Sequence, residues 1–292
     1  MTSSADIRTE IAARVAAELS NNHGVDEVWL EGALAVGLAH AGSDIDLRVV
    51  FHDRPPMLRS RMVDGVRVDL AACTYTDIQS LRSLASSFDV GFDDVERFRQ
   101  VRAALGQLTH LRTARRYTPA GWQVVATASE ISCYRNWVVA DRIEYVLSLV
   151  EDLLGLVTDQ LPAEAEVVCR QLEVCLLGLD LVVADQPLLG DKWLPSLWRR
   201  INDEPPPALP TSAWNAEDFS WFPAVRQRVT AALLRCWPDM IATEELPPAG
   251  TGDQGWLPQR YADGWFLRRG NQRVRLTPGQ LNGWLRLHRE GG

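Results

Sequence analysis

Residues 31–50 read EGALAVGLAHAGSDIDLRVV, a glycine-containing turn followed by a segment rich in β-branched and apolar residues. The segment 45–51 is predicted to form a strand, and the side chains of a strand alternate between its two faces. Asp44 and Asp46 are two residues apart and therefore point to one face, while Leu47 points to the other and can enter a core. Two neighbouring carboxylates repel each other and present the hard oxygen ligands that Mg²⁺ prefers.

A third carboxylate follows in VRVDL, residues 66–70, which is also predicted to be a strand. If this strand lies beside the first, Asp69 joins the same face. Three convergent carboxylates suit two metal ions roughly 3.5–4 Å apart. Gly32 opens a short helix or turn expected at 33–42, where a residue without a side chain lets backbone N–H groups approach phosphate oxygens. The set predicts a two-metal phosphoryl-transfer site, although an Asp-x-Asp pair alone is common in structural roles.

Ser43 precedes Asp44, and ten residues separate Ala33 from Asp44. This pattern resembles the signature of the DNA polymerase β-like nucleotidyltransferase superfamily, in which Gly and then Ser or Gly stand about ten residues before Ser-Asp-x-Asp. The resemblance covers roughly residues 10–75. The helical remainder is similar in layout to small-molecule nucleotidyltransferases such as the aminoglycoside and lincosamide resistance enzymes.

The resemblance implies a reaction as well as a site. A nucleotidyl group would move from an NTP, ATP first, to a hydroxyl of an antibiotic-like or natural-product-like small molecule, with release of pyrophosphate. Catalysis and the binding of two Mg²⁺ ions would fall to Asp44, Asp46 and Asp69, and nucleotide binding to Gly32, Ala33 and Ser43.

Ala33 departs from the family pattern, because the hydroxyl that commonly contacts the nucleotide phosphates is missing there. Two alternatives therefore stay open. One is a weak or inactive nucleotide-binding or antitoxin-like partner protein. The other is an enzyme that nucleotidylates a protein or an RNA.

Three further residues are candidates for substrate contacts. Lys192 is the one lysine of the chain and precedes Trp193. The resembled enzymes often carry a Lys-Trp pair late in the helical domain, which implies that Lys192 approaches the triphosphate; the alternative is a surface lysine at a helix start. Glu130 and Glu144 are candidates for the general base or for acceptor binding, or else they are paired or solvated helix charges. Asp69 is the first choice for the base.

Charge and composition limit the partners. The formal net charge is −8, and residues 130–240 carry nine basic and 17 acidic side chains. Such a segment attracts a cationic small acceptor and disfavours nucleic acid, whereas solvated helix faces would give the same bias. No run of about 18 uncharged apolar residues, no signal-peptide pattern and no CxxC pair is present, which predicts a cytoplasmic protein with free thiols and no membrane insertion.

Hydrophobic periodicity predicts an α+β protein in three parts. Residues 1–120 would form a mixed sheet with flanking helices, 121–243 a helical domain, and 244–292 a linker and a small hairpin-helix module. Strands are expected at 28–30, 45–51, 66–73, 265–267 and 274–276. Helices are expected at 5–19, 77–87, 93–107, 128–158, 163–185, 191–202 and 216–240, and after Thr277.

Overall fold

The computed structural model describes residues 4–209, 221–238 and 255–289. The chain forms two compact units that alternate along the sequence. Unit 1 comprises Met1–Ser87 and Ala103–Tyr134, and unit 2 comprises Phe88–Arg102 and Arg135–Gly292. The three-part division expected from the sequence stays a prediction.

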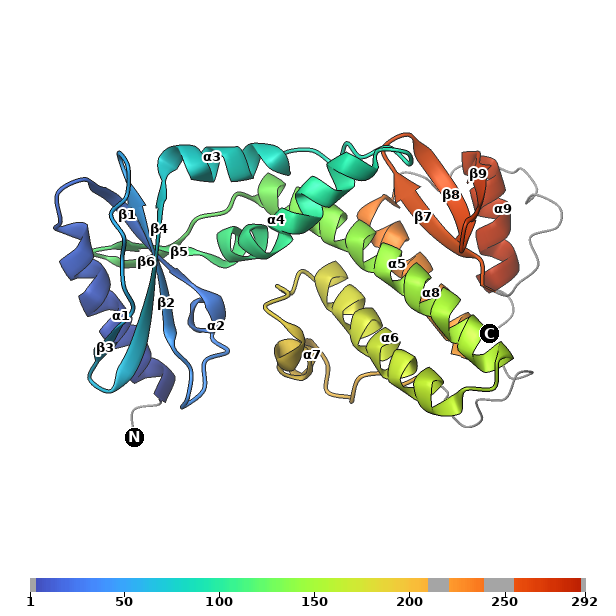
Figure 1. The fold of residues 1–292 in the computed structure, drawn as a ribbon, viewed down its shortest axis with the longest axis horizontal. Coiled ribbons are helices and arrows are strands. Elements are labelled where there is room, and N and C mark those ends of the chain that lie inside the picture. The colour runs from blue at the N-terminus through green and yellow to red at the C-terminus, as the bar shows by residue number, and fades with distance from the viewer. Residues whose placement is uncertain (1–3, 210–220, 239–254, 290–292) are drawn as a thin grey trace. The chain divides into compact units, whose positions relative to one another are not determined.

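Unit 1 is built around a six-stranded sheet in the order β3-β4-β2-β1-β5-β6 (Figure 1). β2 and β4 run parallel and all other neighbours are antiparallel, which confirms the expected mixed sheet. The strands are β1 (Val25–Glu31), β2 (Ile45–Phe51), β3 (Arg61–Val63), β4 (Val66–Thr74), β5 (Arg115–Thr118) and β6 (Gly121–Val124). The helices are α1 (Ser4–Ser20), α2 (Gly32–Ala35), α3 (Tyr75–Leu84) and parts of α4 (Val95–Thr113) and α5 (Ala128–Thr158).

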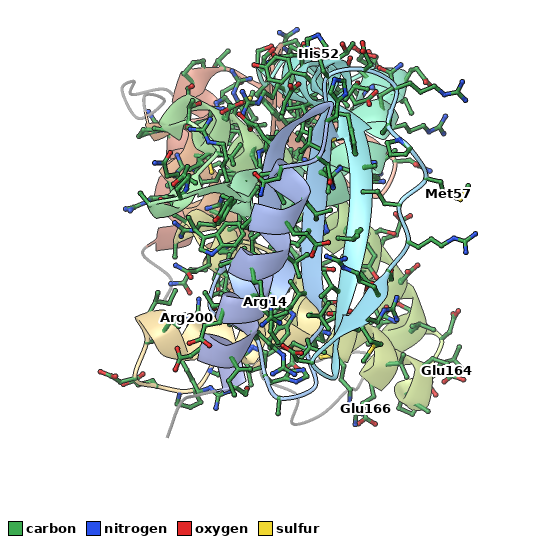
Figure 2. All side chains as sticks on the ribbon, turned by 90° about the vertical axis from the view of Figure 1, so that its left-hand side faces the viewer. Arg14, His52, Met57, Glu164, Glu166 and Arg200 are labelled. Carbon is green, nitrogen blue, oxygen red and sulfur yellow. The ribbon has the colours of Figure 1, made fainter. Side chains whose placement is uncertain are left out.

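Helix α1 covers one face of this sheet with an apolar stripe. Ile11 and Val15 pack in one cluster with Leu47 of β2. The four-residue spacing of apolar residues in the sequence predicts a stripe that starts at Ile7, and this start is wrong, because Ile7 is 46% exposed and Arg8 takes the buried position at 8%. The outer side of α1 carries exposed charges such as Arg14 (Figure 2).

A second, smaller cluster forms on the opposite face. Trp29, Val50 and Cys73 pack there against Ile78 of α3 and Leu111 of α4. Each of the three strand residues alternates with a residue of the α1 face, as the twofold periodicity of a strand requires. The second cluster does not include the residues at one end of β1, β2 and β4 on this face, where polar side chains lie instead.

Unit 2 combines helices with a second, antiparallel sheet in the order β7-β8-β9. Its remaining elements are α6 (Pro162–Val183), the 3-10 turn η1 (Asp191–Trp193), α7 (Leu194–Ile201), α8 (Trp221–Cys236), β7 (Leu257–Tyr261), β8 (Gly264–Arg269), β9 (Gln272–Leu276) and α9 (Pro278–Arg289). Helices α6 and α8 are held by an ion pair between Asp180 and Arg228, with Oδ2 and Nη2 2.7 Å apart. The expected tail hairpin is confirmed as β8–β9.

Several elements differ from the expectation. The hairpin β5–β6 was not predicted, because both strands are only four residues long and β5 is fixed by pairing with the distant β1. Of the short helix or turn expected over 33–42, the structure has the single helical turn α2, and Gly37 follows it with φ +69°. Strand β7 begins at Leu257, inside the expected linker; residues 244–254 of that linker and 216–220 of an expected helix lie outside the described residues.

No helix in the described part of the chain is both long enough and apolar enough to cross a bilayer. The five cysteines are free thiols, as expected, and are buried or half-buried.

Candidate metal centre

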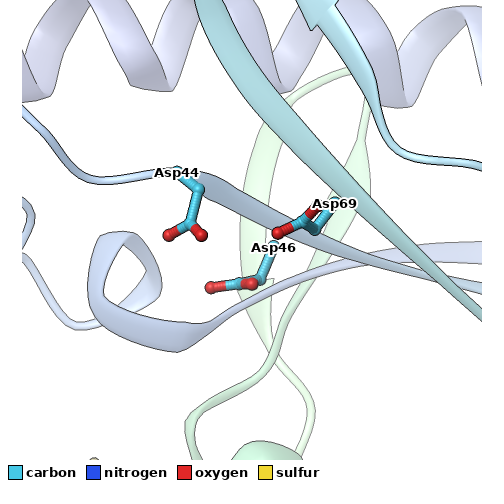
Figure 3. Close-up of side chains that lie close together, drawn as sticks. All are labelled: Asp44, Asp46 and Asp69. Atoms are coloured by element: carbon cyan, nitrogen blue, oxygen red, sulfur yellow. The ribbon is translucent and has the colours of Figure 1, made fainter.

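Three carboxylates meet at one end of the parallel strands of unit 1. Asp44 immediately precedes β2, Asp46 lies in β2, and Asp69 lies directly opposite Asp46 in β4. The side chains turn toward one another from the two strands (Figure 3). Each offers an oxygen, and these oxygens all lie within 4.8 Å of one another. The set could hold a metal ion, and its oxygens are the hard donors that Mg²⁺ prefers.

The electrostatics of the three groups differ. Burial is the main cause that raises the pKa of Asp46, and the nearby Asp44 and Asp69 raise it further. The pKa of Asp69 is lowered, chiefly by a hydrogen bond from Ser60 and then by Arg67, whose Nε lies 2.8 Å from Oδ1. Asp46 is thus a partly desolvated carboxyl among like charges, and a bound cation would favour its ionised form.

Gly32 is required where it stands, for a steric reason. Its φ is +66°, a conformation that side chains disfavour, and a Cβ at this position would lie 2.1 Å from Oδ2 of Asp46. The backbone of Gly32 therefore backs directly against the central carboxylate. The spacing of Gly32 and Asp46 in the sequence reflects this close approach. Contact of Gly32 and the half-buried Ala33 with a nucleotide stays a prediction, and α2 is only one turn long.

The loop before Asp44 is held by a buried arginine of α1. Arg8 donates from Nε to the carbonyl of Ser43 at 2.7 Å and also donates to the carbonyl of Ala41. The hydroxyl of Ser43 accepts from the backbone N–H of His40 at 2.9 Å, which closes the turn. Ser43 therefore shapes the loop, and its expected contact with a nucleotide stays a prediction. The sequence analysis did not identify Arg8 as a site residue. Its position three residues before Ile11, on the apolar face of α1, could have indicated that it is buried.

A buried ion pair lies beside the carboxylates on the same sheet face. Glu31 is the cross-strand neighbour of Asp46 and is 4% exposed. Arg48 holds it with two hydrogen bonds, Nε to Oε1 at 2.6 Å and Nη2 to Oε2 at 3.0 Å. His110 of α4 faces the same carboxylate, with Nδ1 3.7 Å from Oε2. The sequence shows Arg48 two residues after Asp46, but nothing in it marks Glu31 or His110.

A cavity of about 310 Å³ opens next to this ion pair, within unit 1. Trp29 and Leu111 form apolar walls, and Glu31, Arg48 and Gln107 supply polar groups. Its size and mixed lining suit part of a small organic molecule.

The other predicted residues lie elsewhere or have partners. Glu130, in unit 1, closes a capping box with Thr127 at the start of α5 and pairs with Arg82, Oε1 to Nε 3.2 Å. Glu144, in unit 2, accepts from Tyr261 and Arg268. Lys192, also in unit 2, lies in η1 with Nζ 5.1 Å from the ring centre of Trp193. Their predicted roles stay predictions.

No protein-family model and no curated protein matches this chain.

Proposed function

We propose that the chain is a Mg²⁺-dependent nucleotidyltransferase, which moves a nucleotidyl group from an NTP to an acceptor hydroxyl and releases pyrophosphate. The single observation that supports it best is the convergence of Asp44, Asp46 and Asp69 within 4.8 Å, from two parallel strands. A second, independent observation supports it: only a glycine at position 32 lets the backbone lie this close to the carboxylate of Asp46.

In the proposed reaction, Asp44, Asp46 and Asp69 hold two Mg²⁺ ions. When bound, such ions lower the pKa of an attacking hydroxyl and neutralise charge on the triphosphate and the leaving pyrophosphate. The protein itself contributes position. Arg8 fixes the loop that carries Asp44, and the missing side chain of Gly32 makes room for the carboxylate of Asp46.

The finer parts of the proposal concern the substrates. ATP is the first choice of nucleotide, and the acceptor is a small molecule, for which the cavity beside Glu31 and Arg48 gives room. The acidic side chains of residues 130–240 favour a cationic acceptor. Lys192 would supply a mobile positive charge for the triphosphate. The proposed reaction consumes an NTP and needs Mg²⁺, both of which the cytoplasm supplies, so we propose that the protein is cytoplasmic.

The test is pyrophosphate release with Mg²⁺, each of the four NTPs and a panel of aminoglycoside-like acceptors, followed by mass spectrometry of the acceptors. The expected result is a mass gain of one NMP on one acceptor class. Asp46→Asn should lower the rate by about 10³-fold or more, while Asp26→Asn, at the other end of β1, should leave it unchanged. Release that persists in Asp46→Asn contradicts the assignment to this site.

Ala33 supports the second candidate function, a nucleotide-binding partner protein without transfer activity. Tight binding of an NTP to the wild-type chain, with no pyrophosphate release for any acceptor and with a stable co-purifying protein, would favour it.

A further inference from the structure

His110 has one ring nitrogen buried near a carboxylate and a side chain that is partly exposed. Its Nδ1 is buried and has no hydrogen-bond partner, and it faces Oε2 of Glu31 at 3.7 Å. The side chain as a whole is 41% exposed, so the other edge of the ring reaches solvent. An imidazole with a buried nitrogen toward a carboxylate has the layout of a histidine base behind which an acid stands, and such pairs are often longer than hydrogen-bond distance until substrate binds.

The acid behind His110 is itself fixed. Glu31 is buried and held by the two hydrogen bonds from Arg48, so its carboxylate has one orientation. Glu31 and Asp46 are direct neighbours across β1 and β2. The ring of His110 thus lies beside the metal centre without belonging to it.

The other groups near the centre are poor proton acceptors. Asp44, Asp46 and Asp69 would have their oxygens occupied when they hold cations, which makes them poorer proton acceptors. Glu130 is engaged by Thr127 and Arg82. A side chain outside the ligand set would then take the proton of the attacking hydroxyl, in place of the role expected for Asp69.

We propose that His110 is that catalytic residue, and that Arg48 and Glu31 are its positioning residues; this rests on the proposed nucleotidyl transfer. The O–H bond of the acceptor breaks and its proton moves to Nε2 of His110. The freed oxygen forms a bond to the α-phosphorus of the NTP. The bond from the α-phosphorus to the bridging oxygen breaks, and its electron pair leaves with pyrophosphate. Solvent then takes the proton from the imidazolium.

The first experiment locates His110 relative to the bound metal without using activity. The ring-proton NMR signals of His110 are assigned by their loss in His110→Gln, and Mn²⁺ is added to the wild-type protein. We expect these signals to broaden, and those of His52, which faces Asp26 at the far end of the sheet, to stay sharp. His110 signals that stay sharp while Mn²⁺ binds would overturn the placement.

The second experiment tests the role. In His110→Ala, kcat should fall by about 10²- to 10⁴-fold, with the KM for the NTP and the affinity for Mn²⁺ within about twofold of wild type. Free imidazole should restore part of kcat in His110→Ala, and His110→Gln should stay slow. His52→Ala, a histidine of the same unit that also faces a carboxylate, should keep wild-type kcat with or without imidazole.

The outcomes separate the two levels of the proposal. Wild-type kcat in His110→Ala, or a loss that imidazole does not rescue, would overturn the role of His110 and leave the transferase function standing. No transfer by the wild-type protein with any NTP would overturn both.

Discussion

The two faces of the unit 1 sheet are formed by the same strands and differ in what they bury. On the α1 face, Leu47 and Val49 of β2 pack into an apolar cluster. On the other face, the alternating positions Asp46 and Arg48 are polar, and only Val50 enters a small cluster. One strand can therefore supply residues to the hydrophobic core and to a functional site in alternation, because adjacent side chains of a strand point to opposite faces.

The largest effect on stability is therefore expected from the α1 face. Leu47→Ala removes a fully buried side chain and should lower the free energy of unfolding by about 2–5 kcal/mol, since the rigid strands cannot close the cavity. Urea unfolding followed by circular dichroism measures this. Metal affinity of the folded fraction should be retained. A loss of metal affinity larger than the loss of folded protein would show that the two faces are not independent.

Gly32→Ala tests the polar face by a steric change. The left-handed backbone costs about 1–2 kcal/mol for a residue with a side chain, and the new methyl group also pushes the Asp46 carboxylate aside. Gly24→Ala is the matched control, because Gly24 also has positive φ but a Cβ there would meet no atom within 4 Å. Both variants should lose stability in thermal melts, Gly32→Ala at least as much as Gly24→Ala, and only Gly32→Ala should lose affinity for Mn²⁺. Equal metal affinity in the two variants would contradict the claim that a side chain at position 32 disturbs metal binding by displacing Asp46.

The smallest effect concerns pH. Because the pKa of Asp46 is raised in the metal-free fold, its ionised form costs stability; that cost is absent below the unfolded pKa and complete once the pH exceeds the folded pKa. A divalent cation offsets the cost only where Asp46 is ionised. Mg²⁺ should therefore raise Tm by about 2–4 °C at neutral pH and by less as the pH falls toward the usual range of a carboxyl. In Asp46→Asn this Mg²⁺ effect should be weak at every pH, and a full effect would contradict the account.

The convergence of the acids was predictable because it depends on short-range rules. Strand alternation puts Asp44 and Asp46 on one side, and the parallel pairing of two neighbouring strands then places Asp69 opposite Asp46. The spacing from Gly32 reflects a direct contact between the two segments. The period of a strand was enough to place Asp44 and Asp46 on one face, whereas the pairing of β2 with β4, on which the position of Asp69 depends, entered the prediction only as a condition.

The remaining parts of the site depend on contacts between distant segments. Arg8 reaches Ser43 across 35 residues, and His110 reaches Glu31 across 79 positions of the chain. The hairpin β5–β6 is short, and its strand β5 pairs with the distant β1. No periodicity in a single sequence encodes such pairings. The partners of Glu144, which come from the C-terminal sheet, were hidden for the same reason.

The central claim is that Asp44, Asp46 and Asp69 together bind divalent cations, and Mn²⁺ titration followed by electron paramagnetic resonance tests it most directly. The account predicts saturable binding by the wild-type protein, a second ion in the presence of a non-hydrolysable ATP analogue, loss of binding in Asp46→Asn, and unchanged binding in Asp26→Asn. A wild-type protein that leaves Mn²⁺ free in solution, or an Asp46→Asn variant that binds it as well as the wild type, would contradict the account.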